Sequence, residues 1–186
     1  MTSLTPDKGL LLIAEPSLTG DISFNRAVVL LADHTVDGSI GFILNKVFDF
    51  SLSDILPDVP DHFKVYNGGP VEQDNLYFIH KMPDLIPNSI EIANGIFWGG
   101  DFEIVKTLLR NQTIGQDEIK FFLGYSGWDH EQLKEELEAN AWIIANNDDE
   151  KKLIERPYSN FWKDKIKELG GDYLIWANAP EYPSYN

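Results

Sequence analysis

The stretch NRAVVLLADHTVDGSIGFILNK, from Asn25 to Lys46, decides how the rest of the chain is interpreted. Two apolar runs, at 27–32 and 39–44, flank the dipeptide Asp37-Gly38. Asp-Gly suits a two-residue hairpin turn, because both central residues of that turn need a positive φ. The run VVLL is apolar without alternation, which indicates a strand that is covered on both faces. The stretch therefore predicts an antiparallel hairpin.

The segments around this hairpin predict strands early in the chain and helices late. We expect further strands at 9–14, within 63–81 on both sides of a turn at 67–70, at 89–100 with a glycine bend, and at 118–124 before a turn. We expect one helical turn at 51–57, and helices at 102–110 after an Asp101 cap, at 129–140 with Asp129 and Gln132 as a capping box, and at 160–171. Because strands and helices do not alternate regularly, the pattern favours the α+β class in one domain, residues 1–186.

The composition of the chain excludes several classes of function. The protein has 186 residues and no cysteine, which removes disulfides, thiolate catalysis and thiolate metal sites. The N-terminal segment lacks the apolar core of a signal peptide, and no stretch approaches the ~18 apolar residues of a membrane span. We therefore expect a cytoplasmic protein without a membrane partner, with an exposed C-terminal tail at 181–186.

The charge is strongly acidic, with 15 Lys and Arg against 30 Asp and Glu and a formal net charge of −15. Non-specific nucleic-acid binding comes mainly from Lys and Arg that neutralise phosphates. A chain this acidic lacks a domain-wide basic footprint, so direct binding to nucleic acid is not expected.

The segment GYSGW, from Gly124 to Trp128, raises the question of a serine nucleophile. It departs from the nucleophile elbow G-x-S-x-G, because its second glycine comes one position early and Trp128 stands where a small residue is needed. The one histidine that follows, His130, lies too close in sequence to arrive from a separate loop. We interpret Ser126 as part of a tight connection, with Trp128 anchoring the next helix.

Two other features offer weak candidates for chemistry. His34 follows Asp33 at a predicted strand end, but no histidine pair has the spacing of a helical metal site, and we expect no metal and no cofactor. The turn Asn67-Gly68-Gly69-Pro70 could cradle an anion through backbone N–H groups, although it lacks the P-loop lysine.

Taken together, these stretches resemble the YqgE/AlgH family of bacterial proteins. The residues that carry the resemblance are GLLLIAEPSLTGDISFNRAVVLLADHTVDGSIGFILNK at 9–46, VYNGGPV at 65–71, LYFIH at 76–80 and GYSGWDHEQLKEELEANAW at 124–142. The ending ANAPEYPSYN and the stretch FWGGDFE depart from the family pattern. The resemblance implies an α+β fold with a strongly bent, mixed or antiparallel sheet, a partly barrel-like core and flanking helices. It implies no settled activity, although many members are labelled transcriptional regulators.

These observations leave three hypotheses of function open. The first is a non-enzymatic module that binds a small anionic ligand or a protein partner and regulates transcription only indirectly. The second is a hydrolase that uses His34 with a nearby carboxylate, and the third is a direct DNA-binding regulator, which the charge disfavours. No catalytic residues are assigned, and the candidate ligand-binding residues are Arg26, His34, Asn45, Asn67, Gly68, Gly69 and Trp128.

Overall fold

A computed structural model describes residues 4–17, 21–147 and 152–181. Within these residues the chain forms ten strands and five α-helices in a single α+β domain, as the sequence predicts. The strands are β1 Leu11–Ala14, β2 Val28–Thr35, β3 Gly38–Ile43, β4 Val47–Ser51, β5 Lys64–Asn67, β6 Val71–His80, β7 Ile90–Ala93, β8 Ile96–Trp98, β9 Ile119–Asp129 and β10 Trp142–Ala145. The helices are α1 Leu52–Ile55, α2 Phe102–Arg110, α3 Gln132–Glu138, α4 Phe161–Leu169 and α5 Tyr173–Asn178. Apart from Glu181, the predicted tail lies outside the described residues.

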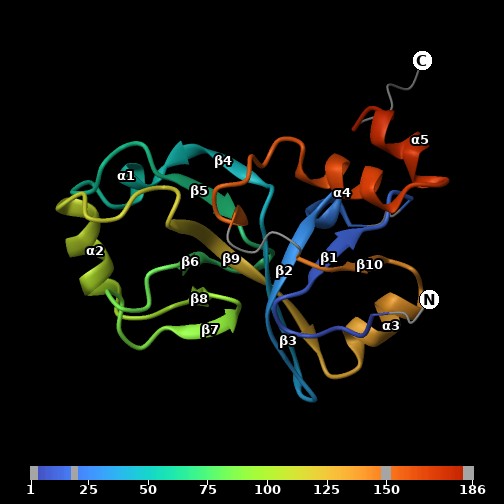
Figure 1. The fold of residues 1–186 in the computed structure, drawn as a ribbon, viewed down its shortest axis with the longest axis horizontal. Helices are drawn as coiled ribbons and strands as arrows, with labels where there is room; N and C mark the ends of the chain where they lie inside the picture. The colour runs from blue at the N-terminus through green and yellow to red at the C-terminus, as the bar shows by residue number, and fades with distance from the viewer. Residues whose placement is uncertain (1–3, 18–20, 148–151, 182–186) are drawn as a thin grey trace.

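Strand β9 joins the two halves of the sheet, as Figure 1 shows. The strand order is β10-β1-β2-β3-β9-β6-β8-β7, while β5 also pairs with β9 and β4 pairs with β5. Every pairing is antiparallel except β5 with β9, so the expected mixed sheet is confirmed. The sheet is open, because β10 and β7 stand at opposite ends of the order. The expected barrel-like core is corrected accordingly.

The hairpin predicted from the opening stretch is present as β2 and β3. Its turn lies one residue earlier than expected, because Thr35 pairs with Gly38 and leaves Val36 and Asp37 as the two turn residues. Neither of those two has a positive φ. Gly38 is needed for a different reason, since a side-chain carbon there would lie 2.5 Å from the carbonyl oxygen of Trp128.

The segment 89–100 forms two strands instead of one bent strand. Strands β7 and β8 are joined at Asn94 and Gly95, whose φ values of 47° and 86° are those of an Asn-Gly hairpin turn. The stretch at 142–145, which the sequence analysis left unassigned, forms β10 and pairs with β1.

The expected turn at GYSGW is also wrong, because β9 continues through it to Asp129. The second half of β9 pairs with β3, from Ser126 opposite Gly41 to Asp129 opposite Gly38, and this pairing keeps the segment extended. Helix α3 then begins at Gln132, so Asp129 does not cap it. One half of the expected capping box is present, since the backbone N–H of Asp129 donates to Oε1 of Gln132 at 3.0 Å.

Helices α1, α2 and α4 form where the sequence predicts, whereas α5 lies in a stretch for which no helix was predicted. Asp101 caps α2 by accepting from the backbone N–H groups of Glu103 and Ile104, at 3.0 and 3.2 Å. Helix α4 buries Trp162 and Ile166 and ends at Gly170 with a φ of +67°. No helix in the described part of the chain is both long and apolar enough to span a bilayer.

Candidate functional site

The connection between β5 and β6 crosses strand β9 at close range. The crossing is required because β5 and β6 lie on opposite edges of β9, where Phe122 pairs with Tyr66 on one side and Tyr77 on the other. A side-chain carbon on Gly68 would lie 2.2 Å from the carbonyl oxygen of Gly124. Backbone cannot move aside as a side chain can, so this position requires glycine.

The predicted anion cradle at this crossing is not formed. The amide of Gly68 donates to the carbonyl of Leu123 at 2.9 Å, and the amide of Gly69 donates to Oδ1 of Asn67 at 3.1 Å. A side-chain carbon on Gly69 would lie 2.3 Å from the backbone of Tyr125. Both amides are already bonded and closely covered, so the turn presents no free donor pair to an anion.

Ser126 contributes to the same crossing. Its side chain is fully buried, and its Oγ donates to the carbonyl of Gly68 at 3.0 Å. That carbonyl also accepts from the amide of Ile43 at 2.9 Å. A hydroxyl held in this way binds two strands together and has no access to a substrate, in agreement with the interpretation of Ser126 as structural.

His34 and Trp128 lie on one row of the sheet. His34 is opposite Ser39 on β3, and Ser39 is opposite Trp128 on β9, so the three side chains share a face. Nδ1 of His34 and Oγ of Ser39 are 2.7 Å apart. Trp128 is buried, and its Nε1 donates to Glu136 of α3 at 2.9 Å, which confirms that it anchors this helix.

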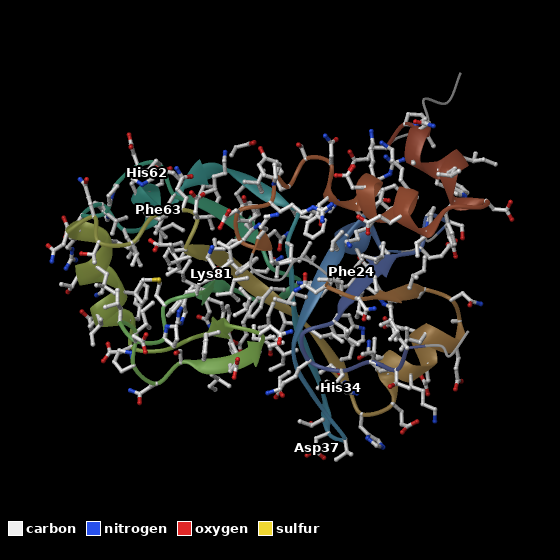
Figure 2. All side chains as sticks on the ribbon, viewed as in Figure 1. Phe24, His34, Asp37, His62, Phe63 and Lys81 are labelled. Carbon is white, nitrogen blue, oxygen red and sulfur yellow. The ribbon has the colours of Figure 1, made fainter. Side chains whose placement is uncertain are left out.

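A cavity of about 370 Å³ opens beside this row, and we call it the His34 cavity. Its lining includes His34, Ser39, His130 and Lys134. The Asp33 carboxylate accepts from the backbone N–H of His34 at 3.0 Å and not from the imidazole. Figure 2 shows His34 at the projecting end of the hairpin, on the other half of the molecule from Lys81.

Arg26 and Asn45 gather at the opposite end of β2. Nδ2 of Asn45 donates to the carbonyl of Arg26 at 2.8 Å. The guanidinium of Arg26 lies 4.8 Å from the ring centre of Trp162, and its Nη2 donates to the carbonyls of Ala179 and Pro180 at 2.9 and 2.8 Å. Arg26, Asn45 and Trp162 border a cavity of about 330 Å³, the Arg26 cavity.

The seven predicted ligand-binding residues therefore do not form one site. Arg26 and His34 stand at opposite ends of β2, roughly 25 Å apart at the usual rise of a strand. Asn67 lies near Arg26 and Asn45, because the backbone N–H of Asn67 donates to the carbonyl of Lys46 at 2.7 Å. Gly68 and Gly69 form the crossing, and His34 lies with Trp128.

A third cavity, of about 270 Å³, contains a lysine that the sequence analysis did not single out. Lys120 lies on β9 among apolar residues and is 4% exposed. Its Nζ is 4.0 Å from the ring centre of Tyr66, and it has no hydrogen-bond partner among the residues that the structure describes. We call this the Lys120 cavity.

Burial shifts the pKa values of the Lys120 amine and of the Tyr66 hydroxyl. Desolvation lowers the pKa of the Lys120 amine to about 7, because no acceptor or carboxylate compensates the buried charge. Burial, and then the neighbouring Tyr158, raise the pKa of Tyr66 to about 12. Near neutral pH this cavity therefore holds an amine that is partly uncharged beside a phenol that stays protonated.

The segment 152–159, between β10 and α4, forms a wall shared by three cavities. It borders the Lys120 cavity, the Arg26 cavity and a cavity of about 500 Å³ that we call the Arg156 cavity. Among the described residues, eight lysines and arginines line these three cavities, against four carboxylates. The cations are Arg26, Lys46, Lys64, Lys120, Lys152, Arg156, Lys163 and Lys165, and the carboxylates are Asp117, Glu155, Glu168 and Glu181.

Some of these cations are neutralised locally and others are not. Lys165 bonds to Glu168 at 2.7 Å, and Arg156 lies 3.5 Å from Asp164. Burial lowers the pKa of Lys46, which Glu181 partly offsets. The three cavities still form a positive region in a protein of net charge −15. Within the described residues, no group of three or more histidines and carboxylates has the arrangement of a metal site.

A family model described as AlgH-like matches residues 11–174. The chain belongs to this AlgH-like family. It is 40% identical to a UPF0301 protein of Cytophaga hutchinsonii over 181 residues, which cover 96% of this chain and 98% of the relative. It is 37% identical to a UPF0301 protein of Bacteroides fragilis over 186 residues, which cover 99% and 93% of the two chains.

Two solved structures share the AlgH-like fold. The solution structure of the AlgH protein of Pseudomonas aeruginosa superposes with a TM-score of 0.73 at 24% identity, covering 97% of this chain and 98% of that one. A crystal structure of a protein from Corynebacterium diphtheriae gives a TM-score of 0.75 at 22% identity, covering 96% and 95%. The names of these proteins state no activity, so the comparisons establish the family and the fold.

One sequence signal pointed to the Lys120 cavity. Lys120 is the single charge in IKFFL, an otherwise apolar run in a strand of this AlgH-like chain. A lysine inside such a run is seldom fully buried without a partner. The cations of the segment 152–159 carried no comparable signal, because their gathering depends on the tertiary fold.

Proposed function

We propose that the protein is a non-enzymatic cytoplasmic module that binds a small anionic ligand in the cavities around the segment 152–159. Binding there would regulate other molecules indirectly, through the occupied state of the protein. The observation that carries the proposal is the gathering, among the described residues, of eight cations against four carboxylates on the walls of three adjoining cavities.

The charge distribution gives this proposal its physical basis. Clefts lined by one sign of charge focus the electric field and raise the local concentration of the opposite ion. A protein of net charge −15 repels anions over much of its surface, so a small anion is drawn to a region where cations outnumber carboxylates. Lys and Arg side chains then provide charge-assisted hydrogen bonds, which are stronger than neutral ones.

A thermal-shift screen with small carboxylates and phosphate esters tests the proposal. A ligand at ~100 times its dissociation constant adds about 2.7 kcal/mol to the free energy of unfolding. We expect Lys64→Gln to weaken binding if the ligand occupies the Lys120 cavity, and Lys163→Gln to weaken it if the ligand occupies the Arg26 cavity. Both lysines line a cavity wall.

Lys106→Gln is the matched control. Lys106 lies on α2, pairs with Glu103 at 2.6 Å and lines none of the three cavities. Each variant removes one positive charge, so a general effect of net charge appears in all three. The proposal fails if no carboxylate or phosphate ester stabilises the wild-type protein, or if Lys106→Gln weakens binding as much as the cavity variants do.

A second candidate function, hydrolysis at His34, is favoured by the 2.7 Å contact between its Nδ1 and Oγ of Ser39 beside a cavity of about 370 Å³. Such a contact can activate a hydroxyl as a nucleophile. Hydrolysis of p-nitrophenyl acetate, measured for wild type, His34→Gln and Ser39→Ala, tests this candidate. Equal rates in the three proteins would eliminate it, and Ser53→Ala is the control for loss of a serine away from the cavity.

A further inference from the structure

Lys120 is a buried amine without a partner. It is 4% exposed and stands between the fully buried or nearly buried Ile119 and Phe121 on β9. No hydrogen-bond acceptor among the described residues reaches its Nζ. Burying a charged amine without an acceptor is unfavourable, and proteins that keep such a lysine commonly use it as a neutral nucleophile.

The groups around the Lys120 cavity leave this amine uncompensated. Among the described residues, the two carboxylates on its walls are Asp117 and Glu155, and Glu155 already bonds to Lys81 at 2.6 Å. The remaining charged groups on the walls, Lys64 and Arg156, are both positive. Desolvation is therefore the effect that sets the pKa of Lys120 near 7.

The second feature is a pair of tyrosines between two amines. The rings of Tyr66 and Tyr158 meet edge to face, with centres 5.8 Å apart. Lys120 lies over Tyr66 at 4.0 Å, and Lys64 lies over Tyr158 at 5.6 Å. The amine of Lys120 is thus enclosed behind the cavity wall, and across the two rings a second cation lies on the more exposed side.

We propose that the Lys120 amine forms an imine with a small 2-oxo acid bound in the Lys120 cavity. The inference rests on the proposed function, because it names the chemical class of the anionic ligand. The carboxylate of a 2-oxo acid suits the positive wall, and the adjacent carbonyl carbon is the electrophile that a neutral amine attacks. An enclosed amine also protects the imine from water, which would hydrolyse it.

The reaction balances without another reactant. The lone pair of Nζ forms a bond to the carbonyl carbon, and the π electrons of the carbonyl move to its oxygen, which takes up a proton. The nitrogen releases its two protons, one when the carbinolamine forms and one when its hydroxyl leaves as water. The product is a C=N double bond between Lys120 and the ligand, and one water molecule is formed per imine.

Reductive trapping tests the proposal directly. The full chain is incubated with pyruvate and sodium cyanoborohydride, and adducts are located by intact-mass measurement and peptide mapping. At pH 7.5 most Lys120 side chains are neutral, whereas a lysine with an ordinary pKa is neutral in about one molecule in a thousand. We expect one lysine adduct per chain, on Lys120, formed about tenfold or more faster than on any other lysine. Peptide mapping distinguishes it from an adduct on the α-amino group, whose ordinary pKa is about 7.7–8.0.

Two variants and one ligand pair sharpen the test. Lys120→Met should abolish the adduct, while Lys64→Arg, which keeps the positive charge, should leave it in place. Lactate carries the same carboxylate as pyruvate and no carbonyl. If lactate and pyruvate stabilise the protein equally and no adduct forms on Lys120, the anionic-ligand function stands and the imine is overturned.

The remaining outcomes are equally decisive. Adducts spread over surface lysines, with the Lys120 peptide unmodified, would overturn the proposal without the use of any variant. Equal trapping of pyruvate and of its neutral methyl ester, which has a similarly activated ketone, would overturn the assignment of the ligand class. Trapping on Lys120 that is half-maximal near pH 7 would support the proposal, because a surface lysine titrates about three units higher.

Discussion

Ser126 and Lys120 are both buried polar residues on strand β9, and they differ in their hydrogen bonding. The hydroxyl of Ser126 donates to the carbonyl of Gly68 at 3.0 Å, where the β5–β6 connection crosses the strand. The amine of Lys120 has no hydrogen-bond partner within the described residues and faces the ring of Tyr66. A buried group with its partner is explained by stability, whereas a buried group without one calls for another explanation.

Strand β9 therefore has a structural end at Ser126 and a candidate functional end at Lys120. At the crossing, the glycines and Ser126 fill the space. The amides of Gly68 and Gly69 and the hydroxyl of Ser126 all form hydrogen bonds. At Lys120, a cavity remains and the electrostatic energy of the charged amine is uncompensated. Substitutions at the two ends of β9 should therefore differ in their effects on stability.

Gly68→Ala should cause the largest loss of stability. The side-chain carbon of the alanine would lie 2.2 Å from the carbonyl oxygen of Gly124, so the β5–β6 connection would have to move away from β9. We expect a loss of about 3 kcal/mol or more in the free energy of unfolding, measured by chemical denaturation. Gly115→Ala is the control, because its nearest contact would be 3.9 Å from a carboxylate of Glu118. Equal stability of the two variants would contradict the close crossing.

Lys120→Met should stabilise the protein near neutral pH. Methionine removes the desolvation penalty and fills a similar volume, so we expect a gain of about 1 kcal/mol or more in the free energy of unfolding. The free energy of unfolding is measured by urea denaturation. Lys64→Met, at an exposed position, should change it by less than about 0.5 kcal/mol. A destabilised Lys120→Met variant would show that the amine has a partner.

The stability of the wild-type protein should rise with pH relative to Lys120→Met. The pKa of Lys120 is about 7 in the folded protein and about 10.4 in the unfolded chain, so between these values the unfolded state binds more protons. The penalty is fully present below pH 7 and is relieved as the pH increases. We expect a gain of roughly 1 kcal/mol per pH unit between pH 7 and 9. A constant difference between the two proteins would refute the buried amine.

Ser126→Ala should have the smallest of these effects. It removes one buried hydrogen bond, but the carbonyl of Gly68 keeps its bond from the amide of Ile43 at 2.9 Å. We expect a loss of about 1 kcal/mol with no change in pH dependence. Ser89→Ala removes a similar 3.1 Å bond at a more exposed position and should cost less. A loss of ligand binding in Ser126→Ala would contradict its structural role.

Much of the fold could be predicted from local pattern. The β2–β3 hairpin, the Asp101 cap and the end of α4 at Gly170 each follow from a few adjacent residues. The turn expected at GYSGW was wrong because the local glycine signal was overridden by pairing with β3, which is far away in the sequence. The Asn94-Gly95 hairpin was predictable in principle, since both residues have the φ values for which that dipeptide is favoured.

The candidate site could be predicted only in small part. Arg26 and Asn45 lie on the wall of a basic cavity, but Gly68 and Gly69 are used by the crossing, and His34 is at the other end of β2. Residues of the segment 152–159 reach the cavities through the packing of α4 against the sheet. No spacing in the sequence indicates that arrangement, because it depends on contacts between elements about 30 or more residues apart.

The titration of Lys120 distinguishes an uncompensated buried amine from a solvated or paired one. Carbon-13 labelling of the lysine side chains allows the Cε resonance of Lys120, assigned by its loss in Lys120→Met, to be followed by NMR from pH 5 to 11. We predict a midpoint near 7, well separated from the other lysines. A midpoint at the ordinary value of about 10.4 would show that the amine is solvated or paired, and would contradict the account.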